Sequence, residues 1–189
     1  MQASANQVAS PAGTPPELVR AAFRDLHAAR LHGFALLVTL GDRPIAAGAA
    51  NRALSAGATR LSDLRHPERA AAWLRARVLA DARRASRSRG RRSALEARSA
   101  LEIMGVEATM QSGLAVLSVR ERGAIVADWI ERLDRRDVAT IVGLDGARLE
   151  RLVRRARARY AAAVADAPDA LSDGPTANRI RTAAERVLA

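Results

Sequence analysis

The chain has 189 residues, of which 49% are hydrophobic, 27% charged and 3% aromatic, a length that suits one ordinary domain or two small ones. Its formal net charge of +11 favours an anionic partner, with nucleic acid as the first candidate and an anionic membrane surface as the second. The absence of cysteine excludes disulfides and thiolate metal sites, and the few aromatic residues argue against a stacking platform for single-stranded nucleic acid.

Residues 1–16 are rich in Ala, Ser, Gln, Gly and Pro and have no periodic apolar face, which predicts a disordered leader. They also lack the basic start and the apolar core of a secretory signal. Apolar runs elsewhere are short and are interrupted by arginine, so no membrane anchor is expected. We therefore expect a cytoplasmic protein that has no membrane partner.

Residues 17–86 predict a first domain made of helices. Apolar residues at helical spacing over residues 16–40 indicate one long helix, with Gly33 as a candidate break. Turn residues then separate it from an Ala-rich helix over residues 45–58. A third helix is expected over residues 68–86. No strand is expected anywhere in the chain, so the predicted fold class is all-α.

Residues 87–112 are predicted to link this domain to a second one. Arginine is frequent on both sides of Gly90, which is typical of a flexible basic linker. A short helix is expected over residues 93–106 and a second linker segment over residues 107–113. We expect the linker to make few contacts and to separate the cores of two small helical domains.

Residues 113–160 predict the second domain, with three amphipathic helices in close succession. Its apolar residues recur at helical spacing in three groups: Ile125, Val126, Trp129, Ile130 and Leu133, then Val138, Ile141 and Val142, then Leu149, Leu152, Val153, Ala156 and Tyr160. Between the last two groups, Gly143 can take the left-handed conformation that ends a helix, and Asp145 can cap the next helix. This arrangement is typical of a helix-turn-helix.

The last helix of this domain opposes its apolar residues with a row of arginines. The row comprises Arg148, Arg151, Arg154, Arg155, Arg157 and Arg159, with Glu150 as the single acid. Such a helix can present guanidinium groups to phosphates or base edges in a DNA major groove. The alternative is a solvated helix face, because the chain contains no lysine and a basic patch is only an electrostatic footprint.

Residues 161–189 form a C-terminal extension. An acidic, proline-containing stretch over residues 166–175 precedes a short predicted helix over residues 176–189, whose apolar face includes Ile180 and Val187. This helix either packs on the preceding domain or docks a partner.

The three histidines, His27, His32 and His66, lack the i,i+4 spacing of a metal site and have no carboxylate pair beside them. The sequence also contains no recognisable nucleophile with its base, no paired acids and no phosphate-binding loop. We therefore expect no enzymatic activity, no metal and no cofactor.

The stretch from residue 117 to residue 160 resembles, without a gap, the C-terminal domain of bacterial RNA polymerase sigma factors of the extracytoplasmic-function group. The residues that carry the resemblance are Leu117, Arg120-Glu121-Arg122, Glu131, Leu133, Ala139, Gly143 and Arg155-Ala156-Arg157. The departures are Gly146, Ala147 and Arg148 at the start of the recognition helix, and Glu150 and Leu152 within it. The resemblance therefore implies the fold of that domain but not its promoter preference.

The first half resembles the helical domain with which the same sigma factors dock on the polymerase clamp and open the promoter. The matching landmarks, in order, are Phe23-Arg24-Asp25-Leu26, Phe34-Ala35-Leu36, Gly41-Asp42-Arg43 and Ala72-Trp73-Leu74. Family members usually follow Gly-Asp with an acidic helix that faces the clamp. The positions of that polymerase-facing helix are occupied here by Ile45, Ala47, Gly48, Asn51 and Arg52, so its acids are lost.

Together the two resemblances imply a sigma-like transcription initiation factor with promoter DNA and core RNA polymerase as partners. One alternative is a divergent sigma-like module that binds a regulatory protein such as an anti-sigma factor. Another is a stand-alone helix-turn-helix DNA-binding regulator. Co-elution with core polymerase, followed by start-site-specific transcription, would discriminate among the three.

Overall fold

The computed structural model describes residues 16–61, 63, 66–87 and 100–165, and within these residues it is entirely helical. The elements are α1 (Pro16–Val38), α2 (Arg43–Ala58), α3 (Pro67–Arg87), α5 (Ala108–Ala115), α6 (Val119–Ile125), the π-helix η1 (Val126–Ile130), α7 (Arg135–Val142) and α8 (Gly146–Ala163). The all-α prediction is thus confirmed over the described residues. None of these helices has the length and hydropathy needed to cross a bilayer.

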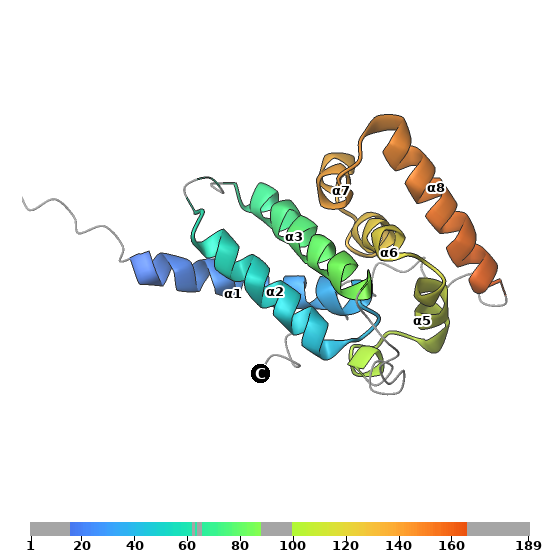
Figure 1. The fold of residues 1–189 in the computed structure, drawn as a ribbon, viewed down its shortest axis with the longest axis horizontal. Coiled ribbons are helices and arrows are strands. Elements are labelled where there is room, and N and C mark those ends of the chain that lie inside the picture. Colours follow the sequence, from blue (N-terminus) through green and yellow to red (C-terminus); the bar gives the residue numbers. More distant parts are fainter. Residues whose placement is uncertain (1–15, 62, 64–65, 88–99, 166–189) are drawn as a thin grey trace, which may run out of the picture.

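Helices α1, α2 and α3 pack side by side and form one end of the molecule (Figure 1). Helix α1 runs through Gly33 without a break, because the residues on both sides of Gly33 are buried and keep the helix packed. Asp42 caps α2, accepting a hydrogen bond from the backbone N–H of Ile45 at 3.1 Å. In the last turn of α2, Gly57 lets Phe23 of α1 and Leu74 of α3 approach the helix backbone closely.

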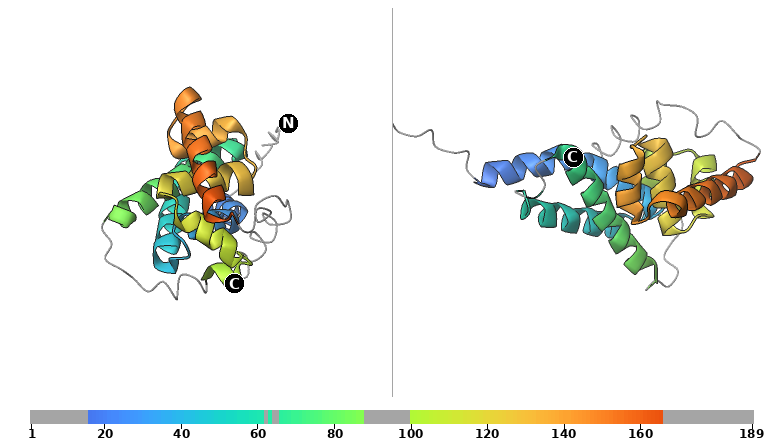
Figure 2. Two further views of the ribbon diagram at one scale, coloured as in Figure 1. Left: turned by 90° about the vertical axis from the view of Figure 1, so that its right-hand side faces the viewer. Right: turned by 90° about the horizontal axis from the view of Figure 1, so that it is seen from above.

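Helices α5 to α8 form the other end of the molecule (Figure 2). The first of the three helices predicted there begins at Val119 and is divided into α6 and η1. A capping box fixes its start: Ser118 accepts from the N–H of Glu121, and the Glu121 carboxylate accepts from the N–H of Ser118. The extension predicted to begin at residue 161 also differs, because α8 continues to Ala163.

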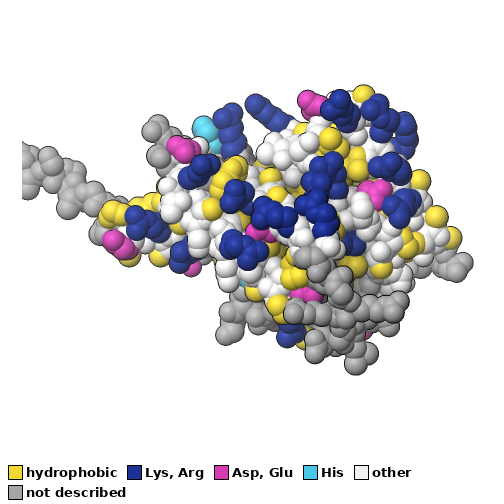
Figure 3. Space-filling view, viewed as in Figure 1, with side chains coloured by type: hydrophobic (Ala, Val, Ile, Leu, Met, Phe, Trp, Pro, Cys, Tyr) yellow, Lys and Arg dark blue, Asp and Glu magenta, His cyan; other side chains and the backbone are white. Residues whose placement is uncertain are grey.

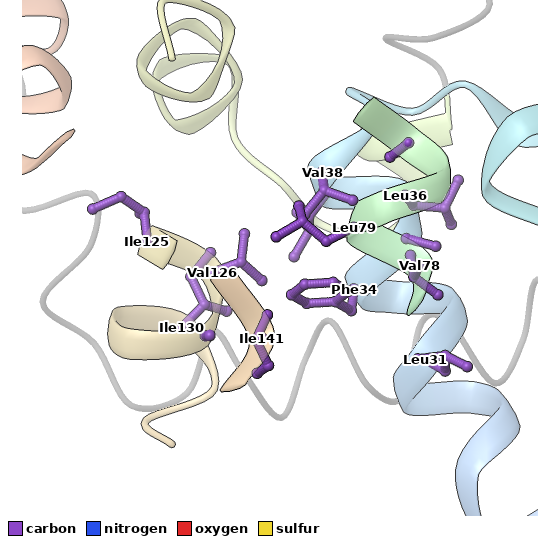
Figure 4. Packing of buried hydrophobic residues seen from close by; sticks show 14 of the residues in the cluster. Leu31, Phe34, Leu36, Val38, Val78, Leu79, Ile125, Val126, Ile130 and Ile141 are labelled. Atoms are coloured by element: carbon purple, nitrogen blue, oxygen red, sulfur yellow. The ribbon is translucent and has the colours of Figure 1, made fainter. Parts of the chain in front are cut away.

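One hydrophobic cluster serves both ends of the molecule. Figure 4 shows Phe34, Val38 and Leu79 from the first three helices facing Val126 and Ile141 from the later ones. Helix α3 is the main contact, since it packs against both α6 and α7. The buried side chains therefore do not divide at the predicted boundary, and the two-domain layout stays a prediction.

The expectation of a linker with few contacts is wrong for residues 100–112. Leu101, Met104, Val106 and Met110 are buried in the shared cluster, and α5 occupies most of the segment predicted as a second linker. Burying the apolar side chains of such a stretch is more favourable in free energy than leaving them in water. The arginine-rich residues 88–99, the leader up to residue 15 and the extension from residue 166 lie outside the described residues.

Two buried arginines fasten the two sets of helices together. Arg75 of α3 donates from Nε to Glu131 Oε2 at 2.6 Å and from Nη2 to Oε1 at 2.9 Å, a bidentate pair just beyond η1. Arg122 of α6 donates from Nε to the carbonyl of Val38, at the end of α1, at 2.8 Å. Each guanidinium group thus donates to acceptors on the opposite set of helices. These hydrogen bonds fix the position of α6 and η1 relative to α1 and α3.

Candidate nucleic-acid interface

Helices α7 and α8 are joined by a short turn whose backbone is set by glycine. Helix α7 starts at the N-cap residue Asp134, whose side chain accepts from the N–H of Asp137 at 2.9 Å. It ends at Gly143, with φ 66° and ψ 41°, the left-handed conformation expected for this residue. No atom lies within 4 Å of where a Cβ on Gly143 would be, so the backbone conformation, and not a lack of space, favours glycine.

The start of α8 differs in one respect from its expected capping. Asp145 occupies the N-cap position, but its side chain makes no capping hydrogen bond. Its backbone carbonyl instead accepts from the N–H groups of Arg148 and Leu149, at 3.1 and 3.2 Å. Gly146, which follows it, has φ 43° and so requires glycine for the same reason as Gly143.

Helix α8 buries its apolar face and exposes every arginine of the predicted row. Its buried residues are Leu149, Leu152, Val153, Ala156 and Tyr160. Arginine side chains are spread over α3 and over the α7–α8 pair on the face shown in Figure 3. The burial pattern thus agrees with both a DNA-binding helix face and a solvated one. The hydrogen bonds of the arginines distinguish the two.

Three arginines of the row are engaged within the protein. Arg155 and Arg159 both donate to the carboxylate of Glu121, at 3.3 and 2.8 Å, and that side chain is only 3% exposed. Arg157 donates to Asp128 at 2.6 Å and lies over the ring of Trp129, 4.8 Å from its centroid. These three side chains hold α8 against α6 and η1, a structural role that the sequence assignment to DNA did not include.

The other three arginines of the row have no partner among the described residues. Arg148, Arg151 and Arg154 make no hydrogen bond or ion pair with any described residue. Their spacing of three places them along one side of the first turns of α8, next to the glycine turn. An anion that approaches the start of α8 would therefore meet guanidinium groups that no carboxylate of the described residues engages.

The acid of α8 is also neutralised from within. Arg135 of α7 donates from Nε to Glu150 at 2.9 Å and from Nη1 to Asp128 at 3.2 Å. These carboxylates raise the pKa of Arg135, with the hydrogen bond to Glu150 as the largest cause. Sequence spacing could not reveal this pair, because Arg135 and Glu150 belong to different helices.

The residues predicted to face polymerase lie along α2. Ile45, Ala47 and Gly48 are half-buried, whereas Asn51 and Arg52 are exposed. Arg52 donates to Asp81 of α3 at 2.9 Å, so its charge is already paired. The outward side of α2 carries no carboxylate beyond its cap.

Two histidines contribute to the core. His27 and His32 are buried, and burial is the main cause that lowers the pKa of each. The ring of Phe23 meets His27 edge-on, with 4.7 Å between their centroids. Within the described residues, His, Asp and Glu side chains form no group of three that could hold a metal ion.

Comparison of the chain with protein-family models, with curated protein sequences and with solved structures finds no match. The likeness to sigma factors therefore rests on the residues quoted for it. The structural features that bear on function are the turn between α7 and α8 and the arginines beside it.

Proposed function

We propose that this chain is a sigma-like transcription initiation factor in which α7 and α8 form a helix-turn-helix that binds promoter DNA. The observation that carries the proposal is a set of three arginines, Arg148, Arg151 and Arg154, that have no partner among the described residues. They lie on the exposed side of a helix that follows a left-handed glycine turn. Core RNA polymerase is the second partner, reached through α1 to α3. The ordered resemblance across both halves of the sequence supports this role.

The two kinds of contact on α8 differ in what they recognise. Arg151 and Arg154 suit phosphates, because a guanidinium fork binds phosphate oxygens regardless of sequence. Arg148 lies at the start of the helix, the part that enters a major groove most deeply. A bidentate contact from Arg148 to guanine would contribute about 1–3 kcal/mol of discrimination.

The DNA-binding test compares two variants that change net charge equally. Arg151→Ala with Arg154→Ala should weaken binding to any duplex and lower the slope of log affinity against log salt by about 2, since each phosphate contact contributes roughly 0.9. The control is Arg20→Ala with Arg24→Ala, two exposed arginines at the far end of α1. Equal slopes for the two variants would show that α8 is not the interface.

The polymerase contact needs its own test, because the outward side of α2 lacks the acids that would steer it to a basic surface. The chain should co-elute with core RNA polymerase and direct transcription from a defined start site. This absence of acids is also the observation that favours the alternatives. Duplex binding without co-elution would indicate a stand-alone DNA-binding regulator, and neither activity would indicate a module that binds a regulatory protein such as an anti-sigma factor.

Restoring acids tests whether α2 is the docking surface. Acids at Ala47, Gly48 and Arg52 should tighten polymerase binding and make it more salt-sensitive. Position 48 has room for the change, because a Cβ there would approach only the end of the flexible Arg52 side chain, at 3.1 Å. Competition against an ordinary sigma factor at two salt concentrations measures the effect. Unchanged affinity at both concentrations would place docking on another surface.

A further inference from the structure

The first turns of α1 carry an apolar face that is exposed to solvent. They project beyond α2 and α3 in both Figure 1 and the right-hand view of Figure 2, and Figure 3 shows hydrophobic side chains there. Leu18, Val19 and Leu26 are 60%, 40% and 62% exposed, and Ala22 between them is exposed as well. At about 100° per residue, the four side chains lie on one side of the helix. Neighbouring exposed apolar side chains of this kind mark a surface that binds another element.

A second segment of the chain repeats the spacing of this face. Residues 176–189 lie outside the described residues, and their sequence places apolar residues at i, i+3, i+7 and i+10, namely Ala177, Ile180, Ala184 and Val187. The same intervals separate Val19, Ala22, Leu26 and Ala29 in α1. This is the pattern with which two helices pack along a common seam. A helix over these 14 residues is marginal on its own in water, so the segment needs a surface to pack against.

The end of α8 lies close to the end of α1. Arg159, in the last turns of α8, donates to Glu121 Oε2 at 2.8 Å. The next residue of α6, Arg122, donates to the carbonyl of Val38, the last residue of α1, at 2.8 Å. Two consecutive residues of α6 thus connect the two helix ends. The chain that follows α8 therefore starts beside α1.

This chain is long enough to reach the exposed face. Leu26 precedes Val38 by 12 residues, which is about 18 Å of helix. The 14 residues 166–179 can span about 46–50 Å when extended. That length covers the distance along α1 as well as the side chains that separate α8 from it. The segment would then run back along α1 from near Ala29 toward its start.

We propose that residues 176–189 dock as a helix on the apolar face of α1 formed by Leu18, Val19, Ala22 and Leu26. Tethering favours this occupant, because a linked segment acts at an effective concentration near the millimolar range. A second copy of the chain is disfavoured, because a net charge of +11 makes two copies repel each other. The contact uses no residue of α8, so the inference is independent of the proposed DNA contact. An outside partner that binds the start of α1 would have to displace this segment first.

Disulfide formation in the full chain tests the contact, because the chain contains no cysteine that would compete. Leu26→Cys is combined in turn with Ile180→Cys and with Ala184→Cys, so that one pair is close in registers that differ by one turn. The control uses Arg24→Cys in place of Leu26→Cys, an exposed position about 200° around α1. Under mild oxidation, the better Leu26 pair should close within one chain at least about tenfold faster than its control, at a rate independent of protein concentration.

Thermal unfolding gives a second readout that needs no new bond. Leu26→Gln and Ile180→Gln should each lower Tm by roughly 2–4 °C, since each removes apolar contact from the same interface. The double variant should fall little further than the larger single loss, as expected of residues in contact. Arg24→Gln is the matched control and should leave Tm unchanged.

The proposal is overturned if neither Leu26 pair outpaces its control, or if both glutamine variants of the apolar faces leave Tm unchanged. Additive losses in the double variant would mean two separate contacts and would overturn it too. Disulfides that join two chains in preference would assign the face to a second copy of the chain, against the proposal. None of these outcomes affects the DNA-binding test on α8.

Discussion

Glu121 lies where α6 meets α8 and determines the role of two arginines that the sequence assigns to DNA. Its carboxylate accepts from the hydroxyl and N–H of Ser118, at 2.7 and 2.9 Å, and from Arg155 and Arg159. Burial on its own would raise the pKa of Glu121, but the hydrogen bonds from Ser118 and the charge of Arg159 together hold it below its ordinary value. A single acid thus converts two surface arginines into structural ones.

Replacing this acid should destabilise the protein in a pH-dependent way. Glu121→Gln is expected to cost about 1–2 kcal/mol at neutral pH, since it weakens charged hydrogen bonds whose arginines are largely exposed. The folded pKa of Glu121 lies below 4.5, so its contribution is present above that pH and is lost as the pH falls through the folded pKa. Urea unfolding of wild type and variant from pH 7 to pH 3 measures this.

The exposed Glu102→Gln is the matched control, because the Glu102 side chain forms no hydrogen bond or ion pair with a described residue. Its unfolding free energy should equal that of wild type throughout the range. A constant difference between Glu121→Gln and wild type from pH 7 to pH 3 would show that the carboxylate charge is not what stabilises the α6–α8 contact.

Tyr160 carries a hydroxyl that its surroundings do not use. The ring is buried against Trp129, 6.1 Å between centroids, while the hydroxyl oxygen has no partner among the described residues. Tyr160→Phe keeps the ring and removes the unpaired group, so the free energy of unfolding should stay equal or rise by up to about 1 kcal/mol. Thermal denaturation tests this, and a loss of more than ~1 kcal/mol would mean that the hydroxyl has an acceptor after all.

At the scale of elements, glycine fulfils two different needs around α8. A Cβ on Gly113 of α5 would stand 2.4 Å from the Tyr160 ring, so the site lacks space. Gly143 has space but a positive φ. The two positions therefore need glycine for different reasons: Gly113 because of close packing, and Gly143 because of its backbone conformation.

Substitutions at the two glycines should differ in kind. Gly113→Ala is expected to cost about 1–3 kcal/mol through overpacking. Gly143→Ala should cost about 1–2 kcal/mol through left-handed strain, and Gly143→Asn less, because asparagine tolerates that region. Chemical denaturation of the three variants gives the comparison. Equal losses for Gly143→Ala and Gly143→Asn would mean that φ is not the limiting factor there.

The elements that sequence could predict are those fixed by neighbouring residues. The turn between α7 and α8 follows from Gly143 and the apolar spacing on both sides of it. The pairing of Arg155, Arg157 and Arg159 could not be predicted in this way, because their acids lie on α6 and η1, 29 to 38 residues earlier. The sequence signal that points to Glu121 is the capping-box spacing from Ser118, which marks this acid as lying at the start of a helix.

At the scale of the whole molecule, burial between distant residues shows contacts across the predicted linker that composition could not reveal. The arginine-rich stretch before residue 100 suggested a boundary, yet the apolar residues just after it join the shared cluster. The composition of a stretch indicates how soluble that stretch is on its own. Whether its side chains are buried depends on which helices pack against it. The packing of α3 against α7 joins residues too far apart in sequence for periodicity to relate them.

The ion pair between Arg75 and Glu131 should be the most sensitive link between the two sets of helices. Arg75→Ala leaves a carboxylate without its partner in a largely buried place and is expected to cost about 3 kcal/mol. Arg75→Met with Glu131→Gln should recover part of this loss, because no unpaired charge remains. Equilibrium unfolding of the single and double variants provides the test. A double variant no more stable than Arg75→Ala would attribute the loss to packing instead.

The hydrophobic cluster shared by the two sets of helices limits how this protein can be divided for experiments. A fragment ending after α3 would expose Leu79 and Val38 to water, and a fragment beginning at α5 would expose Ile141 and Val126. Contiguous apolar surfaces of that kind favour association between fragments. Activities assigned to one half should therefore be measured by substitution in the intact chain, since a truncated protein would report on its newly exposed faces as well.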